Sequence, residues 1–491
     1  MKKEKEALSR GDRITRRRIL GIAGTLLGAG MTGLGGYGAI IRSLHANETT
    51  YSPEARVRPR GRKARPGSPN ILYILGDNHN AETMGCAGHP FIETPGMDRL
   101  AREGVRFEQA FNTTSLCSPS RASILTGAYA HRHGVKNNHT PWTGTHTTFL
   151  EHLSRAGYAT AFIGKWHMPG KLPDLPFLDL FVTYTYREGQ GSYFNCPMIV
   201  NGREVPSRKP YITEEVTDYA TEFIDRVGSR DDGRPWCVYL SHRPGHPPFQ
   251  SPQGIAGMYD DRDVSGVLPS NVDPLWFGKT KGNVFQGVMM GSYHGQYRRY
   301  CETLTAMDRD IERILEHLDR RGLAENTIVI YMGDNGMQWG THGCHGIREP
   351  YEESIRLPFI VRAPGVVRDA GATRRQMVLN IDIAPTLLDL AGITVPGDMD
   401  GMSIVPMLRD PRKKSRDACL LEFWRYFPEN TPGYRGIRTD RYKYIEFERG
   451  RGPWLFDLRE DPTEMHNLYG RKGMEALASR LMKRLAEFPG R

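Results

Sequence analysis

Four short apolar runs recur along the chain, and each of them ends in a cluster of polar residues. They lie at residues 71–75, 159–163, 236–240 and 327–332. A continuous apolar run without alternation predicts a strand that is buried on both faces, as in a parallel sheet. Ligands of an open α/β sheet bind beyond the carboxyl ends of its strands, so the four polar clusters are expected to meet at one edge of the sheet.

Amphipathic stretches separate these runs and predict helices. Their apolar residues recur with the helical period, at residues 97–104, 147–157, 214–227, 300–322 and 382–392. Strands that alternate with helices predict an α/β fold. We therefore expect residues 70–410 to form one large domain, in which helices sandwich a large and mostly parallel sheet.

The pattern changes after about residue 410. Short β-like runs follow one another, and a last helical stretch comes after them, at residues 419–426, 434–437, 442–447, 454–458 and 473–488. Closely spaced strands without helices between them favour antiparallel pairing. Residues 411–491 are therefore predicted to form a small C-terminal subdomain, an antiparallel sheet with a packed helix.

The first 69 residues follow neither pattern. Arg16 and Arg17 precede an uncharged stretch, residues 19–41, in which eight of 23 residues are glycine, so this stretch is only weakly apolar. A twin arginine before such a stretch resembles a twin-arginine (Tat) export signal. We predict an export signal at residues 1–46, a flexible linker at residues 47–69, and a periplasmic or extracellular protein delivered by the Tat translocase. An uncleaved N-terminal membrane anchor is the alternative.

Charge and cysteine content exclude several classes of protein. The net charge is +10, but residues 1–69 contain 15 Lys and Arg against 5 Asp and Glu, and the remaining 51 basic and 51 acidic residues balance. A nucleic-acid-binding surface is therefore not predicted. The seven cysteines are scattered and contain no CxxC pair, which argues against zinc-finger and thioredoxin-like sites and leaves any disulfide pairing open.

One cysteine stands in an unusual segment, residues 112–127, which reads NTTSLCSPSRASILTG. Polar cap-forming residues precede Cys117 and helix-compatible residues follow from Arg121, so a loop that enters a helix is predicted. The positive end of the helix dipole and Arg121 both favour an anion at Cys117. Cys117 is thus a candidate nucleophile, with a buried structural cysteine as the alternative.

Two acid–amide pairs directly follow predicted strands. Asp77 and Asn78 follow the first strand, and Asp334 and Asn335 follow the last. Carboxylate and amide oxygens are ligands that suit Ca²⁺ or Mg²⁺. Either pair alone is also ordinary turn chemistry. Two pairs beside a candidate nucleophile favour a metal site.

Lysine and histidine residues follow the two middle strands. Lys165 and His167 alternate along the extension of their strand, so both can face the same side. His246 lies in a proline-rich turn that stiffens its backbone. His242, His342 and His345 compete with it, and their spacing does not rank them. A solvated surface group is the ordinary alternative for each.

Together these segments resemble the active-site motifs of the type I sulfatases, a family of the alkaline-phosphatase-like superfamily. The similarity covers about residues 70–465. The matching motifs are NILYILGDN ending at Asn78, CSPSR from Cys117, GKWH ending at His167, SHRPGHPPF around His246, YMGDNG around Asp334, YEESIRLP from Tyr351, and LFDL…DP…NL near the C-terminus.

The resemblance implies a role for each residue. In this family the cysteine is oxidised to formylglycine (3-oxoalanine), whose hydrated aldehyde attacks a sulfate ester, so Cys117 would need a formylglycine-generating enzyme as a maturation partner. The implied cofactor is Ca²⁺, in preference to Mg²⁺, held by Asp77, Asn78, Cys117, Asp334 and Asn335. The implied catalytic residues are Cys117, Arg121, Lys165, His167 and His246. The implied substrate contacts are Lys165, His246 and Arg348.

Two positions depart from the family pattern. Relatives mostly have an aspartate where this chain has Asn78, which removes one negative charge and predicts weaker metal binding. Relatives usually have a lysine at the position of Ile347. Arg348, one residue later, is expected to take over the sulfate contact as a bidentate donor.

The predicted function is hydrolysis of a sulfate ester to an alcohol and sulfate, with a sulfated carbohydrate as a possible natural substrate. Two alternatives remain: a phosphonate or phosphodiester hydrolase with the same fold, and a catalytically impaired binder of sulfated glycans. Specificity is expected from the loops at residues 184–207 and 260–291. Their candidate pocket residues are Tyr186, Arg187, Tyr193 and Trp276.

Overall fold

The structure is a computed structural model that describes residue 64 and residues 67–185, 189–229, 233–267, 293–426 and 431–488. The predicted export signal lies outside the described residues, as do most of the linker and the candidates Tyr186, Arg187 and Trp276. Among the described helices, none combines the length and the apolarity that crossing a membrane requires.

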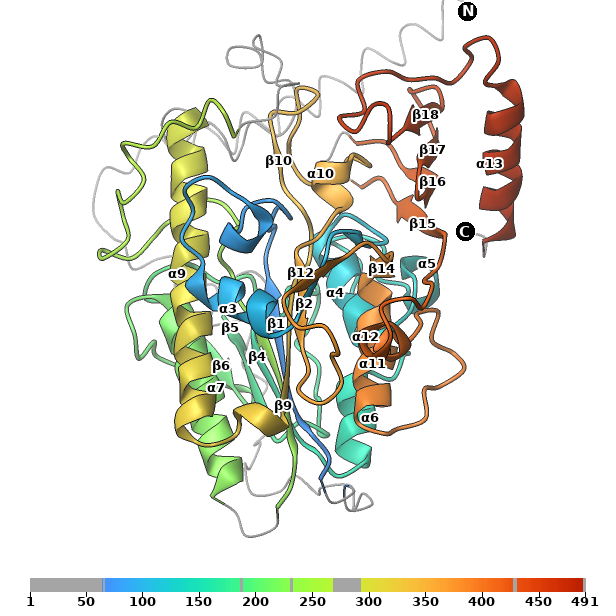
Figure 1. Ribbon diagram of the computed structural model, residues 1–491. Helices are drawn as coiled ribbons and strands as arrows, with labels where there is room; N and C mark the ends of the chain where they lie inside the picture. The colour runs from blue at the N-terminus through green and yellow to red at the C-terminus, as the bar shows by residue number, and fades with distance from the viewer. Residues whose placement is uncertain are drawn as a thin grey trace, which may run out of the picture. The chain divides into compact units, whose positions relative to one another are not determined.

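A ten-stranded mixed sheet occupies the centre of the fold (Figure 1). Its strands, in spatial order, are β13 (Ala372–Arg374), β2 (Val105–Phe107), β12 (Phe359–Arg362), β9 (Thr327–Gly333), β1 (Asn70–Gly76), β8 (Trp236–Ser241), β4 (Ala159–Gly164), β5 (Leu180–Tyr184), β6 (Met198–Val200) and β7 (Arg203–Val205). The run β9-β1-β8-β4-β5 is parallel throughout, and antiparallel strands adjoin it on both sides.

The four strands predicted from the apolar runs are consecutive neighbours in this sheet. Every residue of β1, β4, β8 and β9 is buried, as a strand covered on both faces requires. The register pairs Gly76 with Gly333, so β1 and β9 end at the same level. Gly164 of β4 likewise pairs with Ser241 of β8. The polar residues that follow all four strands are therefore delivered to one edge.

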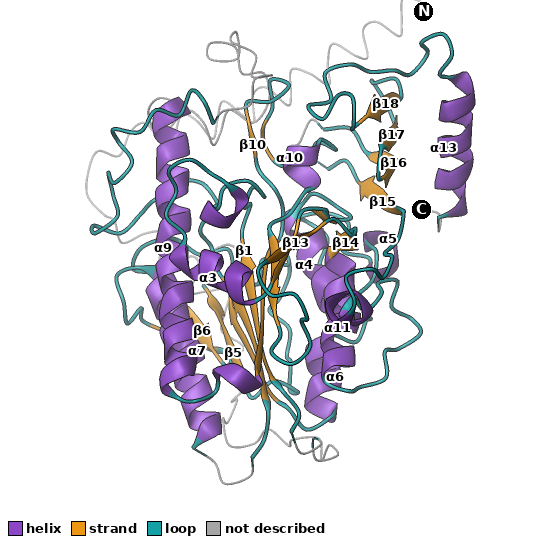
Figure 2. Ribbon diagram, in the orientation of Figure 1, coloured by secondary structure: helices purple, strands orange, loops and turns teal. Residues whose placement is uncertain are grey.

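Helices cover both faces of the sheet (Figure 2). On one face lie α3 (Pro95–Glu103), α7 (Ile212–Gly228) and α9 (Tyr293–Arg320), and on the other lie α4 (Cys117–Thr126), α6 (Phe149–Arg155), α11 (Ile383–Leu390) and α12 (Val405–Arg409). The predicted helices are present, but α9 begins at Tyr293 and not at residue 300. Its first turns bury Tyr293 and Tyr297 against Trp339, a contact between distant segments that the local period does not reveal.

Short elements connect these layers. They are the helices α5 (Ala130–His133) and α10 (Glu352–Ile355), the 3-10 turns η1 (Gly85–Ala87), η3 (Ala324–Asn326) and η4 (Asn380–Asp382), and the paired strands β3 (Ala110–Phe111) with β14 (Val378–Leu379) and β10 (Gln338–Trp339) with β11 (His345–Gly346).

The C-terminal part forms the predicted antiparallel sheet with a packed helix. Its elements are β15 (Ala418–Phe423), β16 (Tyr434–Thr439), β17 (Tyr442–Phe447), β18 (Trp454–Asp457) and α13 (Glu475–Glu487). The first strand ends at Phe423 and not at residue 426. It is tied to the large domain, because Glu422 N–H donates to Thr113 O (2.9 Å) and the Glu422 carboxylate contacts His131 Nδ1 (2.9 Å). The domain boundary at residue 410 stays a prediction.

A buried ion cluster also joins the two parts. Lys443 on β17 is fully buried and contacts Glu352 Oε1 of α10 (3.1 Å) and Glu464 Oε1 (2.5 Å). Lys443→Met would leave Glu464 without a cation among the described residues and Glu352 with only Arg438 (3.0 Å), so we expect the free energy of unfolding to fall by about 3–5 kcal/mol. Denaturant unfolding measures the change. The control is Arg320→Met, which removes an exposed pair with Glu316 and should cost no more than about 0.5 kcal/mol; equal losses in both variants would contradict the prediction.

Candidate active site

The register of β1 and β9 places the two acid–amide pairs side by side. Asn78 N–H donates to Asp334 Oδ1 (3.0 Å), and Asn335 Nδ2 lies 3.4 Å from Asn78 Oδ1. Asp77 and Asp334 are both fully buried. Burial and the charge of Asp77 raise the pKa of Asp334. Two buried carboxylates this close require cations near them.

Cys117 reaches this cluster from the first turn of α4. Its Sγ lies 3.9 Å from both Asp77 Oδ1 and Asn78 Oδ1, and Asn335 Nδ2 lies 3.6 Å from the sulfur. The helix begins at Cys117 itself, whereas the sequence predicted helical residues only from Arg121. The whole helix is buried. The next residue links α4 to the segment that follows β4, because the Ser118 hydroxyl donates to His167 O (2.6 Å).

Two buried cations neutralise the two carboxylates. Arg121 binds Asp334 Oδ2 through Nε (2.9 Å) and Nη2 (2.8 Å). Its Nη1 donates to Ser241 Oγ (2.6 Å) and to Lys165 O (3.0 Å). Lys165 Nζ forms an ion pair with Asp77. When all four side chains are ionised, their charges therefore cancel.

The Cys117 thiol is not anionic in this environment. Burial raises its pKa to about 12; the carboxylates of Asp334 and Asp77 act in the same direction, whereas Lys165 and Arg121 oppose them. Arg121 favours the anion at this position, as predicted, but burial has the larger effect on the thiol pKa. A thiolate nucleophile is thus disfavoured at neutral pH.

Two of the four candidate histidines differ clearly in their surroundings. His246 is partly exposed, and its Nδ1 lies 2.7 Å from Pro247 O. Burial lowers its pKa well below the usual range, and the charge of Lys165 adds to this. His242 is fully buried, and its ring nitrogens have no hydrogen-bond partner in the part of the chain that the structure describes. The local geometry therefore favours His246, as the family motif does.

His342 and His345 lie elsewhere, in and beside the β10–β11 hairpin. The His342 ring stacks on Tyr351 (3.7 Å between centroids), and the His345 ring packs edge-on against Trp339 (4.9 Å). His167 belongs to the central cluster. Burial lowers its pKa well below the usual range, followed by the charges of Lys165 and Arg121. Its Nδ1 is buried and has no partner among the described residues.

The residues of the cluster fit a hard divalent cation. Ligand atoms of Asp77, Cys117 and Asp334 all lie within 4.8 Å of one another. The Asn335 amide now turns its nitrogen to the cluster, while its oxygen accepts from Asn112 Nδ2 (3.3 Å). Half turns of both amides would present the Asn335 oxygen to the cluster instead and would let Asn112 Oδ1, buried and without a partner in the described region, accept the Asn335 N–H.

Neighbouring residues hold both Arg348 and Tyr193, and the sulfate contact predicted for Arg348 stays a prediction. Arg348 has a positive φ of 103°; its N–H donates to Ser354 Oγ (3.1 Å), and its Nε donates to Tyr426 Oη (3.4 Å). Tyr193 is almost fully buried and donates to His246 O (2.5 Å), so it supports the site from inside and does not line an open pocket.

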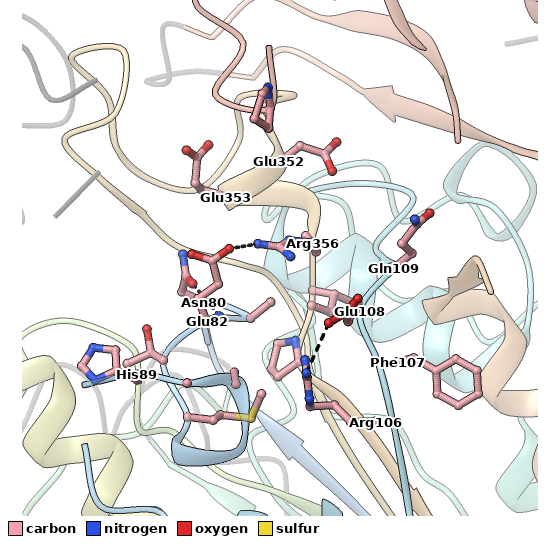
Figure 3. A pocket seen from close by; sticks show the side chains of 18 of the residues that line it. Asn80, Glu82, His89, Arg106, Phe107, Glu108, Gln109, Glu352, Glu353 and Arg356 are labelled. Atoms are coloured by element: carbon pink, nitrogen blue, oxygen red, sulfur yellow. Dashed lines mark hydrogen bonds and ion pairs between the residues drawn. The ribbon is translucent and has the colours of Figure 1, made fainter. Parts of the chain in front are cut away.

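A large cavity, of about 1080 Å³, lies between the loop that starts at Asn80, strand β2 and the C-terminal sheet (Figure 3). None of the predicted site residues lines it. Arginines and carboxylates pair within it: Arg356 with Glu82, and Arg106 Nη2 with Glu108 (3.4 Å). These pairs balance part of the charge that lines the cavity.

Comparison with known proteins identifies the family. A family model described as sulfatase matches residues 69–393. The chain belongs to the sulfatase family. A second model, described as the C-terminal part of N-sulphoglucosamine sulphohydrolase, matches residues 340–490. This second match extends the sulfatase similarity over β15 to β18 and α13.

Individual sulfatases are similar to this chain over most of its length. An N-acetylglucosamine-6-O-sulfatase of Bacteroides thetaiotaomicron is 30% identical, with 85% of this chain and 86% of the relative covered. An ulvan-active sulfatase of Formosa agariphila is also 30% identical, covering 89% and 85%. A solved structure of a protein in complex with its substrate D-glucosamine-2-N,6-O-disulfate has a TM-score of 0.78 and 28% identity, covering 86% of this chain and 97% of that chain.

These matches confirm several predictions from the sequence. The protein is a type I sulfatase of the alkaline-phosphatase-like superfamily and a sulfuric ester hydrolase. In the structure, the predicted site residues that follow β1, β4, β8 and β9 lie with Cys117 and Arg121 at one sheet edge, and their catalytic and metal-binding roles stay predictions. Sequence reasoning missed two supporting residues, Ser241 and Asn112, which bind Arg121 and Asn335. Ser241 directly ends β8, a position that could have marked it.

Proposed function

We propose that this sulfatase removes a sulfate ester from a sugar and that Cys117, converted to formylglycine, carries the reaction. The supporting observation is the position of Cys117 between two acid–amide pairs, within 4.8 Å of Asp77 and Asp334 ligand atoms. The hydrated aldehyde of formylglycine would supply the nucleophilic hydroxyl.

The proposed cofactor is Ca²⁺, held by Asp77, Asn78, residue 117, Asp334 and Asn335. A divalent cation there would screen the negative charge of the sulfate and of the nucleophile. Arg121 and Lys165 pair with Asp334 and Asp77 and hold these carboxylates in place, and Lys165 is also proposed to contact a sulfate oxygen.

The proposed proton donor to the departing alcohol is His246, assisted by Lys165. His246 Nδ1 faces a carbonyl oxygen, which only accepts, so the proton to be donated must be the Nε2 proton of the imidazolium form. His167 is proposed to orient the nucleophile and to act as the base in the second half of the reaction. Its Nδ1 still lacks a partner among the described residues.

The proposed substrate class is a sulfated amino sugar or a related sulfated polysaccharide fragment. Support comes from the relatives, one named for N-acetylglucosamine 6-O-sulfate and one bound to glucosamine disulfate. The test is release of sulfate by calcium-loaded enzyme from N-acetylglucosamine 6-sulfate, glucosamine N-sulfate and ulvan fragments, with an aryl phosphodiester as the rival substrate. Faster turnover of the phosphodiester than of every sulfate would overturn the proposal.

Export through the Tat pathway also remains a proposal. It rests on Arg16 and Arg17 before the glycine-rich stretch at residues 19–41. A protein that crosses the membrane already folded would receive its modification and metal beforehand. Cell fractionation with Arg16 and Arg17 both changed to Lys tests it, and unchanged export would contradict it.

Arg348 is proposed to contact the sulfate, as inferred from the sequence. Arg348→Met should then raise KM about 10-fold while kcat stays nearly constant, because a contact made equally in the bound and transition states is lost. Steady-state kinetics on an aryl sulfate measures both constants. Tyr426→Phe, which removes the hydroxyl that Arg348 Nε contacts, is the companion variant. A fall in kcat with constant KM would assign Arg348 to the chemical step instead.

A further inference from the structure

Arg243, in the turn between β8 and His246, is a buried cation near the site. Its side chain is only 5% exposed. The other two cations, Lys165 and Arg121, each bind a carboxylate. Among the described residues no carboxylate pairs with Arg243. A buried charge without a counter-ion lowers the stability of a fold, and such groups concentrate at functional sites.

The guanidinium of Arg243 binds carbonyl oxygens and an aromatic ring. Its Nε donates to Gly191 O (3.1 Å), and its Nη2 donates to Pro247 O (3.2 Å). Its Cζ lies 4.3 Å from the centre of the Tyr193 ring. Nη1 is buried and has no hydrogen-bond partner in the part of the chain that the structure describes. The arginine is therefore held firmly, although its charge is not balanced.

Two of these partners also hold His246. The Pro247 carbonyl oxygen accepts a hydrogen bond from Arg243 Nη2 and another from His246 Nδ1 (2.7 Å). The Tyr193 hydroxyl donates to His246 O (2.5 Å). In addition, His246 N–H donates to Arg243 O (3.2 Å). Because the shared carbonyl fixes the proton on Nδ1, it fixes which nitrogen of His246 remains for the substrate. A shift of that carbonyl would rotate the imidazole.

The charge of Arg243 acts on the same imidazole. Burial lowers the pKa of His246, and the charges of Lys165 and Arg243 lower it further. Arg243 also contributes to the low pKa of His167. An anionic substrate would supply negative charge here and would favour the imidazolium form of His246. That form carries a proton on Nε2 for the leaving alcohol, and the neutral ring left behind keeps its Nδ1 proton on Pro247 O.

We propose that Arg243 is a positioning residue for sulfate-ester hydrolysis, which holds His246 in the orientation that delivers a proton to the leaving alcohol. This inference rests on the proposed function, because it assumes that His246 is the proton donor. Arg243 is not proposed to touch the reacting atoms. Its effect passes through the Pro247 carbonyl, the Tyr193 ring and its own charge.

The experiment compares two leaving groups in Arg243→Met. A sugar sulfate expels an alcohol that must be protonated as it leaves, whereas 4-nitrophenyl sulfate expels a phenolate that need not be. We expect kcat/KM to fall about 100-fold on N-acetylglucosamine 6-sulfate and no more than about threefold on 4-nitrophenyl sulfate. In a His246→Ala background, Arg243→Met should have no further effect on either substrate, because the two residues act as one unit.

Further variants separate positioning from stability. Arg243→Lys keeps the charge but not the two-pronged geometry, and should recover about 10-fold of the lost activity. Tyr193→Phe keeps the ring but loses the bond to His246 O, and should show a smaller loss with the same preference for the sugar sulfate. Arg362→Met removes a buried arginine of β12 that pairs with Glu103 (2.7 Å) of α3. This variant should lower Tm and leave the ratio of kcat/KM on the two substrates unchanged.

The outcomes distinguish this inference from the proposed function. Wild-type enzyme that hydrolyses neither sulfate overturns both. The positioning role alone is overturned if the wild-type enzyme is active but Arg243→Met and Tyr193→Phe lower kcat/KM equally on both substrates. A further loss in the His246→Ala background would also overturn it, since Arg243 would then act independently of that histidine.

Discussion

Cys117→Ala is expected to lose at least about 10⁴-fold in kcat on an aryl sulfate, because it removes the precursor of the proposed nucleophile. The fold should tolerate the change, since the thiol makes only long contacts of 3.6–3.9 Å with its neighbours. Sulfate release measures the loss. Mass spectrometry of the Cys117 peptide from the wild-type protein should show an aldehyde in place of the thiol.

Cys301→Ala is the matched control. Cys301 is equally buried, on α9, and its thiol pKa is also raised by burial. This variant should remain active and keep the aldehyde at position 117. Fully active wild-type enzyme with an unmodified Cys117 thiol would contradict the prediction, because no formylglycine would then be needed.

Calcium is expected to raise the stability of the protein, and Asn78→Asp is expected to increase its affinity. At about 100 times its dissociation constant, a ligand that binds only the folded state adds about 2.7 kcal/mol to the free energy of unfolding. Asn78→Asp adds one negative charge to the proposed ligand set, so the dissociation constant for Ca²⁺ should fall about 10-fold. Asn78 has a φ of 46°, a conformation that aspartate also tolerates.

Calorimetric titration and thermal unfolding of chelator-treated protein measure both effects without relying on activity. Asn201→Asp is the control: it adds the same charge at another left-handed position, with a φ of 49°, in the turn between β6 and β7. It should leave the affinity unchanged. Equal calcium affinities in the wild-type protein and Asn78→Asp would remove position 78 from the ligand set.

The parallel centre of the sheet was predictable because burial on both faces leaves a direct mark on the sequence. The strands β1, β4, β8 and β9 are continuous apolar runs, and the polar residues that follow them mark the site. The edge strands β6 and β7 were not predicted. They are three residues each and only partly buried, so they carry no period long enough to recognise.

The site was predictable where residue type alone determines the chemistry. Asp77, Asp334 and Cys117 could be named from the sequence, and the structure brings them together. The ionisation of Cys117 was not predictable, since it depends on how burial compares with four nearby charges. The surroundings of Arg243 were also hidden, because its partners, Gly191 and Pro247, are main-chain carbonyls.

Strands β1 and β9 end side by side, at the paired residues Gly76 and Gly333, and this has a consequence for the order of folding. Asn78 and Asp334 are 256 residues apart in the chain, and the bond between them exists only when those two strands have paired in register. Such distant pairings carry a large cost in chain entropy and form late. Calcium binding should therefore appear together with the complete sheet, and a partly folded chain would have no functional metal site.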